Sequence, residues 1–208
     1  LRVWVAACAT GEEAYSLAIL LHEHAATVGY RGRISVFATD AHRRSPEVAS
    51  AGIYEEAQLR GVSAERRARY FTPEGPRRFK VRAELRKMIV FAPQNLLNDP
   101  PFTKMDLVSC RNLLIYFQPE AQARAIATLN FALRKNGALF LASSEGLGVF
   151  ADDFETVSGT HKLFRKTRDV RLPTLVMDPQ PRATGGPLVR RPDIRPTVAI
   201  DRHLLHDY

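Results

Sequence analysis

The sequence has few cysteines and no long apolar run. These two features argue against a disulfide-rich protein and against a membrane-spanning one. Two cysteines, Cys8 and Cys110, occur in 208 residues, each in or at the end of an apolar segment. Such a pair indicates buried thiols in a reducing compartment rather than a disulfide framework. No segment approaches the roughly 20 consecutive apolar residues of a membrane span, and no basic-then-apolar leader begins the chain. We therefore expect a cytoplasmic protein without a membrane span.

Several motif classes are also missing. No histidine pairs with a cysteine at metal-ligand spacing, so the sequence predicts no metal site, and His22 and His24 are expected to face solvent. The G-x-G-x-x-G fingerprint is absent, which disfavours a nicotinamide-dependent oxidoreductase. The net charge of +8 is typical of nucleic-acid-binding proteins, but residues 165–208 carry nine basic and five acidic side chains and so half of this surplus (9 − 5 = 4 of 8). We expect no nucleic-acid partner.

Apolar segments alternate with amphipathic ones, and this alternation predicts a doubly wound α/β domain. The segments with the composition of short buried strands are residues 2–7, 33–39, 87–92, 105–110, 138–142 and 161–166. Helical periodicity occupies residues 12–28, 43–51 and 119–133. Strand–helix–strand units form a parallel sheet with helices on its faces. The sequence thus predicts a Rossmann-like sheet, with Asn136-Gly137 as the turn into its fifth strand.

Two segments fall outside this pattern. Residues 63–86 are polar and contain the turn signal Pro73-Glu74-Gly75-Pro76, so we expect a helix and a hairpin outside the main sheet. Residues 168–208 contain six prolines and are typical of a Pro/Arg-rich linker or tail. The expected organisation is one domain over residues 1–167 with a small inserted subdomain at about 63–86. Because the chain begins without Met, we also expect it to be a piece of a longer polypeptide.

Small and acidic residues follow the first strand, where a doubly wound sheet binds its ligand. The turn from Ala7 to Gly11 lets a ligand approach the backbone and the N–H groups of the next helix. Glu12 and Glu13 would repel a pyrophosphate there, whereas a phosphate-free ligand with positive charge would be accepted. S-adenosylmethionine, which carries a sulfonium and an ammonium group, is such a ligand. Alternatively, Thr10 caps the helix and the glutamates favour its dipole.

Polar residues also follow the next three strands. Asp40 ends the second strand, 29 residues after Gly11, and such an acid accepts hydrogen bonds from both ribose hydroxyls of a nucleoside. Alternatively, Asp40 is the N-cap of a helix beginning near His42. Asn95 and Asn112 offer amides for an adenine edge, a ribose or a methionine group, although asparagines in loops are often simple turn residues.

Three strings resemble the successive motifs of the CheR methyltransferases, which modify chemotaxis receptors. They are residues 5–16 (VAACATGEEAYS), 37–40 (FATD) and 106–117 (DLVSCRNLLIYF). Shorter pieces in the same order are residues 51–54, 95–97, 137–140 and 144–145. The resemblance covers roughly Leu1 to Lys166 and is to the C-terminal S-adenosylmethionine-binding domain of the family. Residues 143–146 and 161–163 are also similar to CheR domains fused to a CheB methylesterase.

The resemblance implies a class I methyltransferase fold and a protein-glutamate O-methyltransferase that acts on chemotaxis receptors or related signalling proteins. S-adenosylmethionine would be the cofactor and S-adenosylhomocysteine (SAH) the product. Glu12 or Glu13, with Glu12 preferred, would contact the methionine part, and Asp40 would hold the ribose. The other implied cofactor-binding positions are Ala7, Gly11, Asn95, Leu96, Asn112 and Leu113. Tyr116 and Arg111 are the implied catalytic positions, with Tyr116 near the transferring methyl group.

Two departures from the family pattern modify these expectations. The family's upstream helical domain, which carries a functionally important arginine, is absent from this sequence, so the chain alone is expected to bind cofactor poorly and to turn over slowly. The loop around residues 73–76 is shorter than in members that dock on a receptor's C-terminal pentapeptide. We therefore expect pentapeptide-independent binding to receptors.

Two other functions stay open from the sequence. One is a non-catalytic module that binds S-adenosylmethionine or a protein partner within a fused signalling protein. The other is a nucleic-acid amino-methyltransferase, suggested by residues 98–102 (NDPPF). That signature belongs directly after the fourth strand, where it grips a flipped base, but here it precedes that strand. The receptor methyltransferase is therefore favoured.

Overall fold

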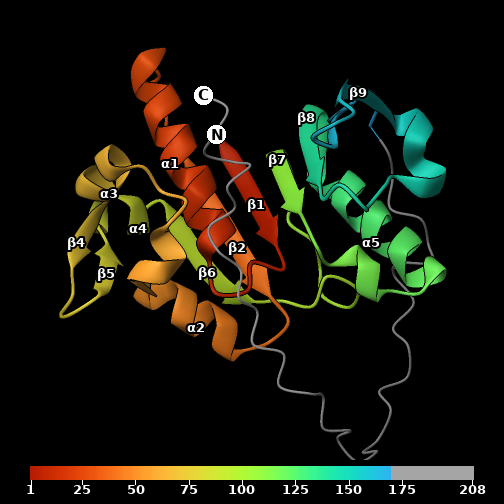
Figure 1. Ribbon diagram of the computed structural model, residues 1–208. Helices are drawn as coiled ribbons and strands as arrows, with labels where there is room; N and C mark the ends of the chain where they lie inside the picture. Colours follow the sequence, from red (N-terminus) through yellow and green to blue (C-terminus); the bar gives the residue numbers. More distant parts are fainter. Residues whose placement is uncertain (170–208) are drawn as a thin grey trace, which may run out of the picture.

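The computed structural model describes residues 1–169, which form a large and a small sheet (Figure 1). The strands of the large sheet are β1 (Arg2–Ala6), β2 (Ser35–Asp40), β6 (Ile89–Pro93), β7 (Met105–Cys110), β8 (Leu133–Leu141), β9 (Phe154–Ser158) and β10 (Leu163–Lys166). The small sheet contains β3 (Ile53–Glu55), β4 (Phe71–Pro73) and β5 (Arg78–Val81). All but the first two residues of the expected tail, 168–208, lie outside the described residues.

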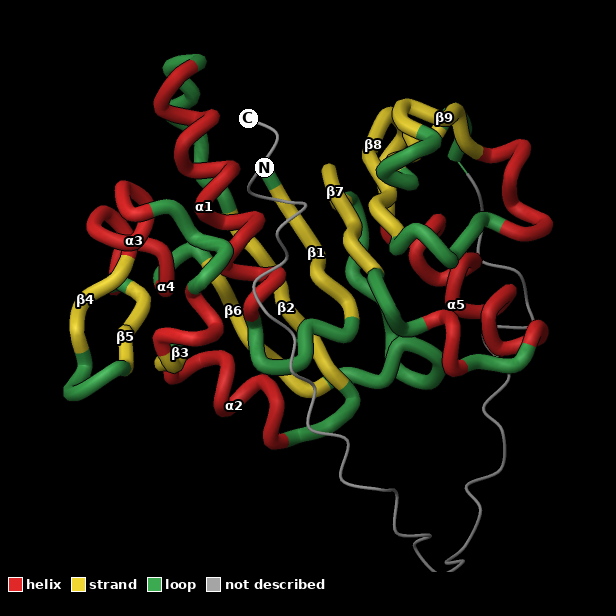
Figure 2. Tube along the Cα trace, viewed as in Figure 1, coloured by secondary structure: helices red, strands yellow, loops and turns green. Residues whose placement is uncertain are grey.

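Helices connect most of these strands. The α-helices are α1 (Glu12–Thr27), α2 (Arg44–Ala51), α3 (Ala64–Tyr70), α4 (Ala83–Arg86) and α5 (Pro119–Ala132). The short 3₁₀ helices are η1 (Glu56–Leu59), η2 (Leu114–Tyr116) and η3 (Gly148–Asp153). Residues 94–104, between β6 and β7, form a loop (Figure 2). None of the helices in residues 1–169 is both long and apolar enough to cross a membrane.

The large sheet has the order β6-β2-β1-β7-β8-β10-β9, so the chain changes direction across the sheet at β1. β1 pairs in parallel with both neighbours, and Val5 lies opposite Ala38 on one side and Ser109 on the other. Among the described strands, β10 runs antiparallel to β8 and β9. This confirms the predicted doubly wound α/β fold and places a topological switch point between β1 and β7.

Alternate side chains of β1 enter two separate cores. Val3 and Val5 pack in a cluster with α1 and the small sheet, whereas Trp4 and Ala6 pack in a cluster with α5. Side chains of a strand alternate between the faces of its sheet, so a strand buried on both faces is apolar throughout. The five residues of β1 after Leu1 therefore read as an almost continuous apolar run because both faces of β1 are covered.

The small sheet lies beside α1, at the β6 end of the large sheet (Figure 1). The sequence predicted a helix and a hairpin outside the main sheet, and α3 with the β4–β5 hairpin confirms this. It missed β3, which follows α2 and pairs antiparallel with β5. The small sheet therefore begins at Ile53, before the predicted start of the inserted segment at about residue 63. We call residues 53–86 the inserted subdomain below.

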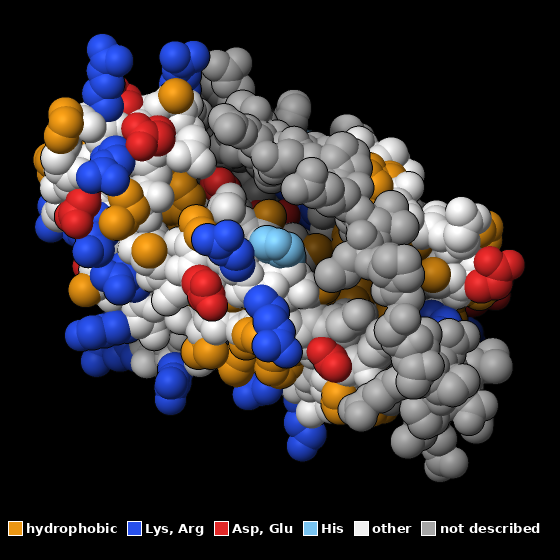
Figure 3. Space-filling model, turned by 90° about the horizontal axis from the view of Figure 1, so that it is seen from below, with side chains coloured by type: hydrophobic (Ala, Val, Ile, Leu, Met, Phe, Trp, Pro, Cys, Tyr) orange, Lys and Arg blue, Asp and Glu red, His pale blue; other side chains and the backbone are white. Residues whose placement is uncertain are grey.

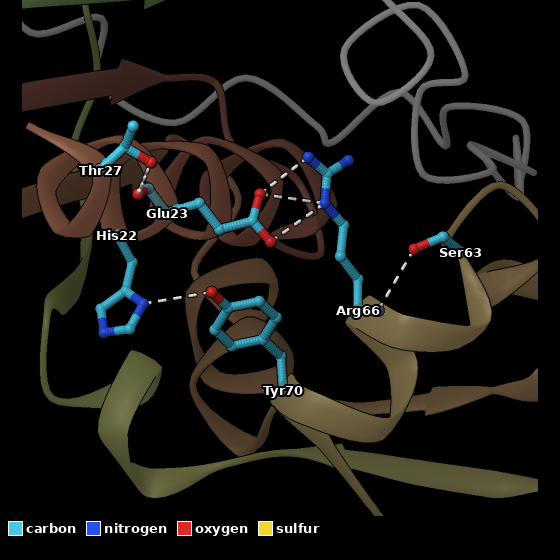
Figure 4. Close-up of polar contacts among 6 residues, drawn as sticks. All are labelled: His22, Glu23, Thr27, Ser63, Arg66 and Tyr70. Carbon is cyan, nitrogen blue, oxygen red and sulfur yellow. Dashed lines mark hydrogen bonds and ion pairs between the residues drawn. The ribbon is translucent and has the colours of Figure 1, made fainter. Parts of the chain in front are cut away.

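The inserted subdomain is attached to α1 by a set of side-chain contacts (Figure 4). His22 Nδ1 lies 3.1 Å from the Tyr70 hydroxyl and His22 Nε2 lies 3.2 Å from a carboxylate oxygen of Glu84. Glu23 forms an ion pair with Arg66, with a shortest N···O distance of 2.7 Å. The prediction that His22 faces solvent is therefore wrong, because α3 and α4 cover this part of α1.

The fifth strand was also misplaced from the sequence. β8 begins at Leu133, directly after α5, rather than at Ala138. Asn136 takes a left-handed φ of 65° inside β8, and the pairing of β8 with β7 is irregular nearby. The turn-forming pair at 136–137 thus produces an irregularity within a longer strand. The sequence also missed β9, an edge strand of five residues with three exposed side chains.

Lys166, the last residue of β10, is a buried lysine that contacts the junction between α5 and β8. Its residue is 1% exposed, and its ammonium group donates to the carbonyl oxygens of Asn130 at 2.7 Å and Leu133 at 2.8 Å. These carbonyls lie at the end of α5 and the start of β8, where the helical hydrogen-bond pattern stops. Lys166 therefore ties the last strand to the α5–β8 junction.

Replacing Lys166 by Met should destabilise the fold by about 2 kcal/mol or more, because two buried carbonyls lose their donor. Urea unfolding measures this, with Lys135→Met as a control that removes an exposed lysine of β8 and should change stability by less than about 0.5 kcal/mol. Equal stability of Lys166→Met and the natural chain would mean that burying the ammonium group costs as much as its hydrogen bonds contribute.

Candidate functional site

The carboxyl ends of β1, β2, β6 and β7 meet at one edge of the large sheet, the lower edge in Figure 1. Because the strands are parallel, the segments that follow them are brought together there. Figure 3 views the molecule from this side and shows Lys and Arg side chains in separate groups, with acidic and hydrophobic side chains between them. The part of the described surface that is visible in this view is therefore not a continuous basic field.

The turn after β1, residues 7–11, has an unusual backbone. Ala7, Ala9 and Gly11 have positive φ values of 58°, 45° and 93°. The Cys8 N–H donates to the Thr39 carbonyl of β2 at 2.9 Å, which ties the turn to the neighbouring strand. Non-glycine residues rarely adopt this conformation, so surrounding contacts must impose it.

Gly11 is also the point of closest packing in the turn. A Cβ atom at Gly11 would lie 2.8 Å from Ala49 Cβ of α2, 3.1 Å from the Tyr54 hydroxyl and 3.2 Å from Phe91. Both the left-handed backbone and the lack of space therefore require glycine here. Ala49 of α2 and the Tyr54 hydroxyl occupy one side of the turn. The approach of a ligand to this backbone stays a prediction.

Asp40 at the end of β2 holds the same turn from the other side. Its carboxylate accepts the Ala9 N–H at 3.0 Å and the His42 N–H at 2.8 Å. The helix α2 begins later, with Arg43 as its N-cap, so the alternative of Asp40 as the helix cap is wrong. Each oxygen of Asp40 takes one of these bonds and keeps a further acceptor position.

The two glutamates at the start of α1 diverge. Glu13 accepts the Ser109 hydroxyl of β7, and one of its oxygens lies 4.0 Å from Nη1 of Arg111. The Arg111 guanidinium in turn lies 4.8 Å from the centre of the Phe140 ring. Glu13 therefore faces the switch point between β1 and β7, and its side chain is 21% exposed.

Glu12 points toward the inserted subdomain and is 5% exposed. It accepts the Thr10 hydroxyl at 2.7 Å and Nε2 of Gln58 at 3.2 Å. Burial raises the pKa of Glu12 above its ordinary value, while the hydrogen bond from Thr10 opposes this rise. Because Thr10 donates to Glu12 and the N-cap is Gly11 without a side-chain bond, the prediction that Thr10 caps α1 is wrong.

The segment after β6 contains Asn95 and Leu96. The Asn95 side-chain oxygen accepts the Leu97 N–H at 3.0 Å, and the Asn95 N–H donates to Asp99 at 2.7 Å. Asn95 thus stabilises its own loop, as the turn interpretation held, and it is exposed, whereas Leu96 is 8% exposed.

The segment after β7 carries Asn112, Leu113 and Tyr116. Asn112 is exposed with φ 58°, Leu113 is partly buried, and Tyr116 is 75% exposed. Glu145, which is 5% exposed, fixes this segment by accepting the N–H groups of Leu113 at 2.9 Å and Leu114 at 2.8 Å.

Three residues that contact the candidate site were not assigned from the sequence: Tyr54 and Gln58 at the first turn, and Glu145 behind the Asn112 segment. Glu145 belongs to one of the short motif pieces, which was the only signal for it. Tyr54 likewise lies in the piece at residues 51–54, but nothing in the local pattern marked Gln58. Within residues 1–169, no three His, Cys, Asp or Glu side chains are grouped so that they could hold a metal ion.

Comparison with known proteins gives a family match along most of the chain. A family model described as "CheR methyltransferase, SAM binding domain" matches residues 1–163. An uncharacterized 104.1 kDa protein of Rhodobacter capsulatus is 42% identical over 208 residues, which are 97% of this chain and 21% of that protein.

Two relatives carry the name chemotaxis protein methyltransferase. The one from Vibrio parahaemolyticus is 36% identical over 160 residues, 76% of this chain and 58% of its own length. The one from Pseudomonas aeruginosa is 37% identical over 161 residues, 76% of this chain and 59% of its own length. The chain thus spans less than two thirds of the length of each of these three relatives.

Replacing Gly11 by Ala should destabilise the chain more than replacing Gly29 by Ala. Both glycines have positive φ, which costs alanine about 1 to 2 kcal/mol, but a Cβ at Gly29 meets nothing within 4 Å. Overpacking against Ala49 should add about 1 to 3 kcal/mol at Gly11 alone. Denaturant unfolding of both variants measures the difference, and equal losses would contradict the packing described for the turn.

Replacing Glu12 by Gln should make stability less dependent on pH. Because the pKa of Glu12 is raised in the folded chain, its contribution to stability is fully present below the unfolded pKa and is lost as pH rises through the folded pKa. The variant should therefore gain stability relative to the natural chain as pH rises from the ordinary glutamate pKa of 4.5 through the raised folded pKa, as measured by urea unfolding. The exposed Glu65→Gln should show no such gain, and a constant difference across the pH range would disprove the prediction.

Proposed function

This chain belongs to the CheR methyltransferase family, and on that premise we propose that it transfers a methyl group from S-adenosylmethionine to glutamate side chains of chemotaxis receptors or related signalling proteins. The observation that carries the proposal is the meeting of three features at one sheet edge. They are the strained turn at residues 7–11, Asp40 beside it, and Glu13 at the switch point. A doubly wound sheet binds its ligand at such an edge.

Asp40 and Glu13 bind different parts of the cofactor. Asp40 uses its remaining acceptor positions for the two ribose hydroxyls, while Ala7 and Gly11 bring the backbone of the turn close to the cofactor. Glu13, rather than Glu12, accepts the ammonium group of the methionine part. This assignment rests on position and exposure, because Glu13 faces β7 with a side chain that is 21% exposed, whereas Glu12 is 5% exposed and faces the inserted subdomain.

The loops after β6 and β7 complete the site. Asn95 and Leu96 line the adenosine side, and Asn112 and Leu113 line the methionine side, with their backbone fixed by Glu145. Tyr116 lies next to the transferring methyl group, where its 75% exposed side chain is available to an incoming protein substrate. Arg111 holds Glu13 in place and so acts on the cofactor through it.

The reaction is a direct displacement. A carboxylate oxygen of the substrate glutamate attacks the methyl carbon, the carbon–sulfur bond breaks, and its electron pair stays on sulfur to give S-adenosylhomocysteine and a methyl ester. A glutamate with a pKa near 4.3 is ionised at neutral pH, so no general base is needed. The site has to align the two reactants and exclude water, and such positioning can contribute about 7 kcal/mol or more.

The partners follow from the family and from one local feature. The β4–β5 hairpin is closed by the short connection at residues 74–77, which supports binding to receptors without a C-terminal pentapeptide. A cytoplasmic location, where receptor signalling domains lie, accords with this role, as does a place within a larger protein fused to a CheB methylesterase. Residues 98–102 lie before β7 rather than after it, which disfavours the nucleic-acid amino-methyltransferase.

Calorimetric titration of the chain with S-adenosylhomocysteine tests the cofactor site. We expect binding that is weakened at least tenfold in Asp40→Ala, because loss of the carboxylate removes both ribose acceptors and a fixed turn. The control Asp152→Ala removes an exposed aspartate of η3 and should bind within twofold of the natural chain, and NADH should not bind.

Incubation with radiolabelled S-adenosylmethionine and a receptor cytoplasmic fragment should then yield base-labile methyl esters. Absence of S-adenosylhomocysteine binding, both here and in a chain with its upstream sequence restored, would overturn the proposal.

A further inference from the structure

The inserted subdomain reaches the cofactor turn through two side chains. Tyr54 of β3, which is 3% exposed, donates its hydroxyl to the Thr10 carbonyl at 2.8 Å. Gln58 of η1 donates Nε2 to Glu12 at 3.2 Å. The turn at residues 7–11 is thus held by the inserted subdomain on one side and by β2 on the other.

The orientation of the Gln58 amide is fixed by its own helix. Its side-chain oxygen accepts the Glu55 N–H at 2.9 Å, as part of a capping box at the start of η1. With the oxygen committed to an N–H group, the amide nitrogen must point the other way, toward Glu12. Gln58 therefore presents a donor to the Glu12 carboxylate, not an acceptor.

These bonds converge on Thr10. Its hydroxyl donates to Glu12, which Gln58 holds, and its carbonyl accepts from Tyr54. The preceding residue, Ala9, donates its N–H to Asp40. A displacement of the inserted subdomain would therefore pull on the backbone directly beside the ribose-binding carboxylate.

A second attachment lies about ten residues further along α1. The contacts of His22 with Tyr70 and of Glu23 with Arg66 join α1 to α3 (Figure 4). The inserted subdomain thus contacts α1 at its first turn and again in its second half. The first attachment touches the cofactor turn and the second does not, which allows their effects to be separated.

We propose that Tyr54 and Gln58 are positioning residues for the cofactor, and that through them occupation of the cofactor site is coupled to the inserted subdomain. This inference rests on the proposed function, because it requires the cofactor to bind at residues 7–11. Coupling between two sites is reciprocal. A protein partner that shifts the inserted subdomain therefore changes cofactor affinity, and bound cofactor steadies the subdomain.

The test is titration of S-adenosylhomocysteine into the natural chain and its variants. Tyr54→Phe and Gln58→Met should each bind about three- to tenfold more weakly, the effect of one lost hydrogen bond. Gln58→Glu keeps the acceptor for Glu55 but lacks the donor, so it should also bind more weakly. Tyr70→Phe is the matched control, since it removes a tyrosine hydroxyl of the same subdomain whose hydrogen bond, among residues 1–169, is with His22, and it should bind within twofold.

Hydrogen exchange provides a readout that loss of stability alone would not produce. Bound S-adenosylhomocysteine should slow amide exchange at residues 53–58 of the natural chain and of Tyr70→Phe. In the Tyr54→Phe/Gln58→Met double variant, saturating ligand should still slow exchange around residues 7–11 but no longer at 53–58.

The outcomes separate the two proposals. If neither the natural chain nor a chain with its upstream sequence restored binds S-adenosylhomocysteine, the proposed function falls and this inference with it. If the natural chain binds, but Gln58→Glu and Tyr54→Phe bind as tightly as Tyr70→Phe, the inference alone is overturned, and Gln58 serves only to cap η1. Protection of residues 53–58 that persists in the double variant would likewise overturn the coupling.

Discussion

The close packing of the turn at residues 7–11 is the constraint on which the rest of the site depends. Gly11 has no room for a Cβ because Ala49, Tyr54 and Phe91 approach it from three different elements. This contact fixes where α1 starts, and the start of α1 fixes where Glu12 and Glu13 point. Positive φ values at Ala7 and Ala9 are the local strain that accompanies this placement, and the bond from Ala9 to Asp40 helps to sustain it.

Adjacent residues at a helix start can serve different partners because successive side chains point about 100° apart around the axis. Glu13 reaches Ser109 and Arg111 at the switch point, whereas Glu12 reaches Gln58 in the inserted subdomain. The Glu-Glu pair thus joins the first turn to the main sheet on one side and to the subdomain on the other. One short motif in this way connects the switch point of the large sheet to the inserted subdomain.

Two carboxylates, the partly buried Asp40 and the buried Glu145, act as fixed acceptors at both ends of the candidate site. Asp40 takes two backbone N–H groups near the first turn, and Glu145 takes those of Leu113, Leu114 and Ala142 behind the loop after β7. Hydrogen bonds from N–H groups to a carboxylate are stronger than those between neutral partners. The loops at the candidate site are therefore fixed by charge as well as by packing.

The sequence by itself determined the doubly wound fold and the segments after β1, β2, β6 and β7 that meet at one edge of the sheet, where it predicts that a ligand binds. These features depend on local composition and on residues adjacent in the chain. Only the tertiary structure decided which glutamate faces the switch point, that Thr10 serves Glu12 rather than capping α1, and that Tyr54 and Gln58 reach the turn from more than 40 residues away. Those contacts join distant segments, and no periodicity within one segment encodes them. The sequence also predicted the start of β8 wrongly, because pairing with the distant strand β7 extends β8 through residues that locally favour a turn.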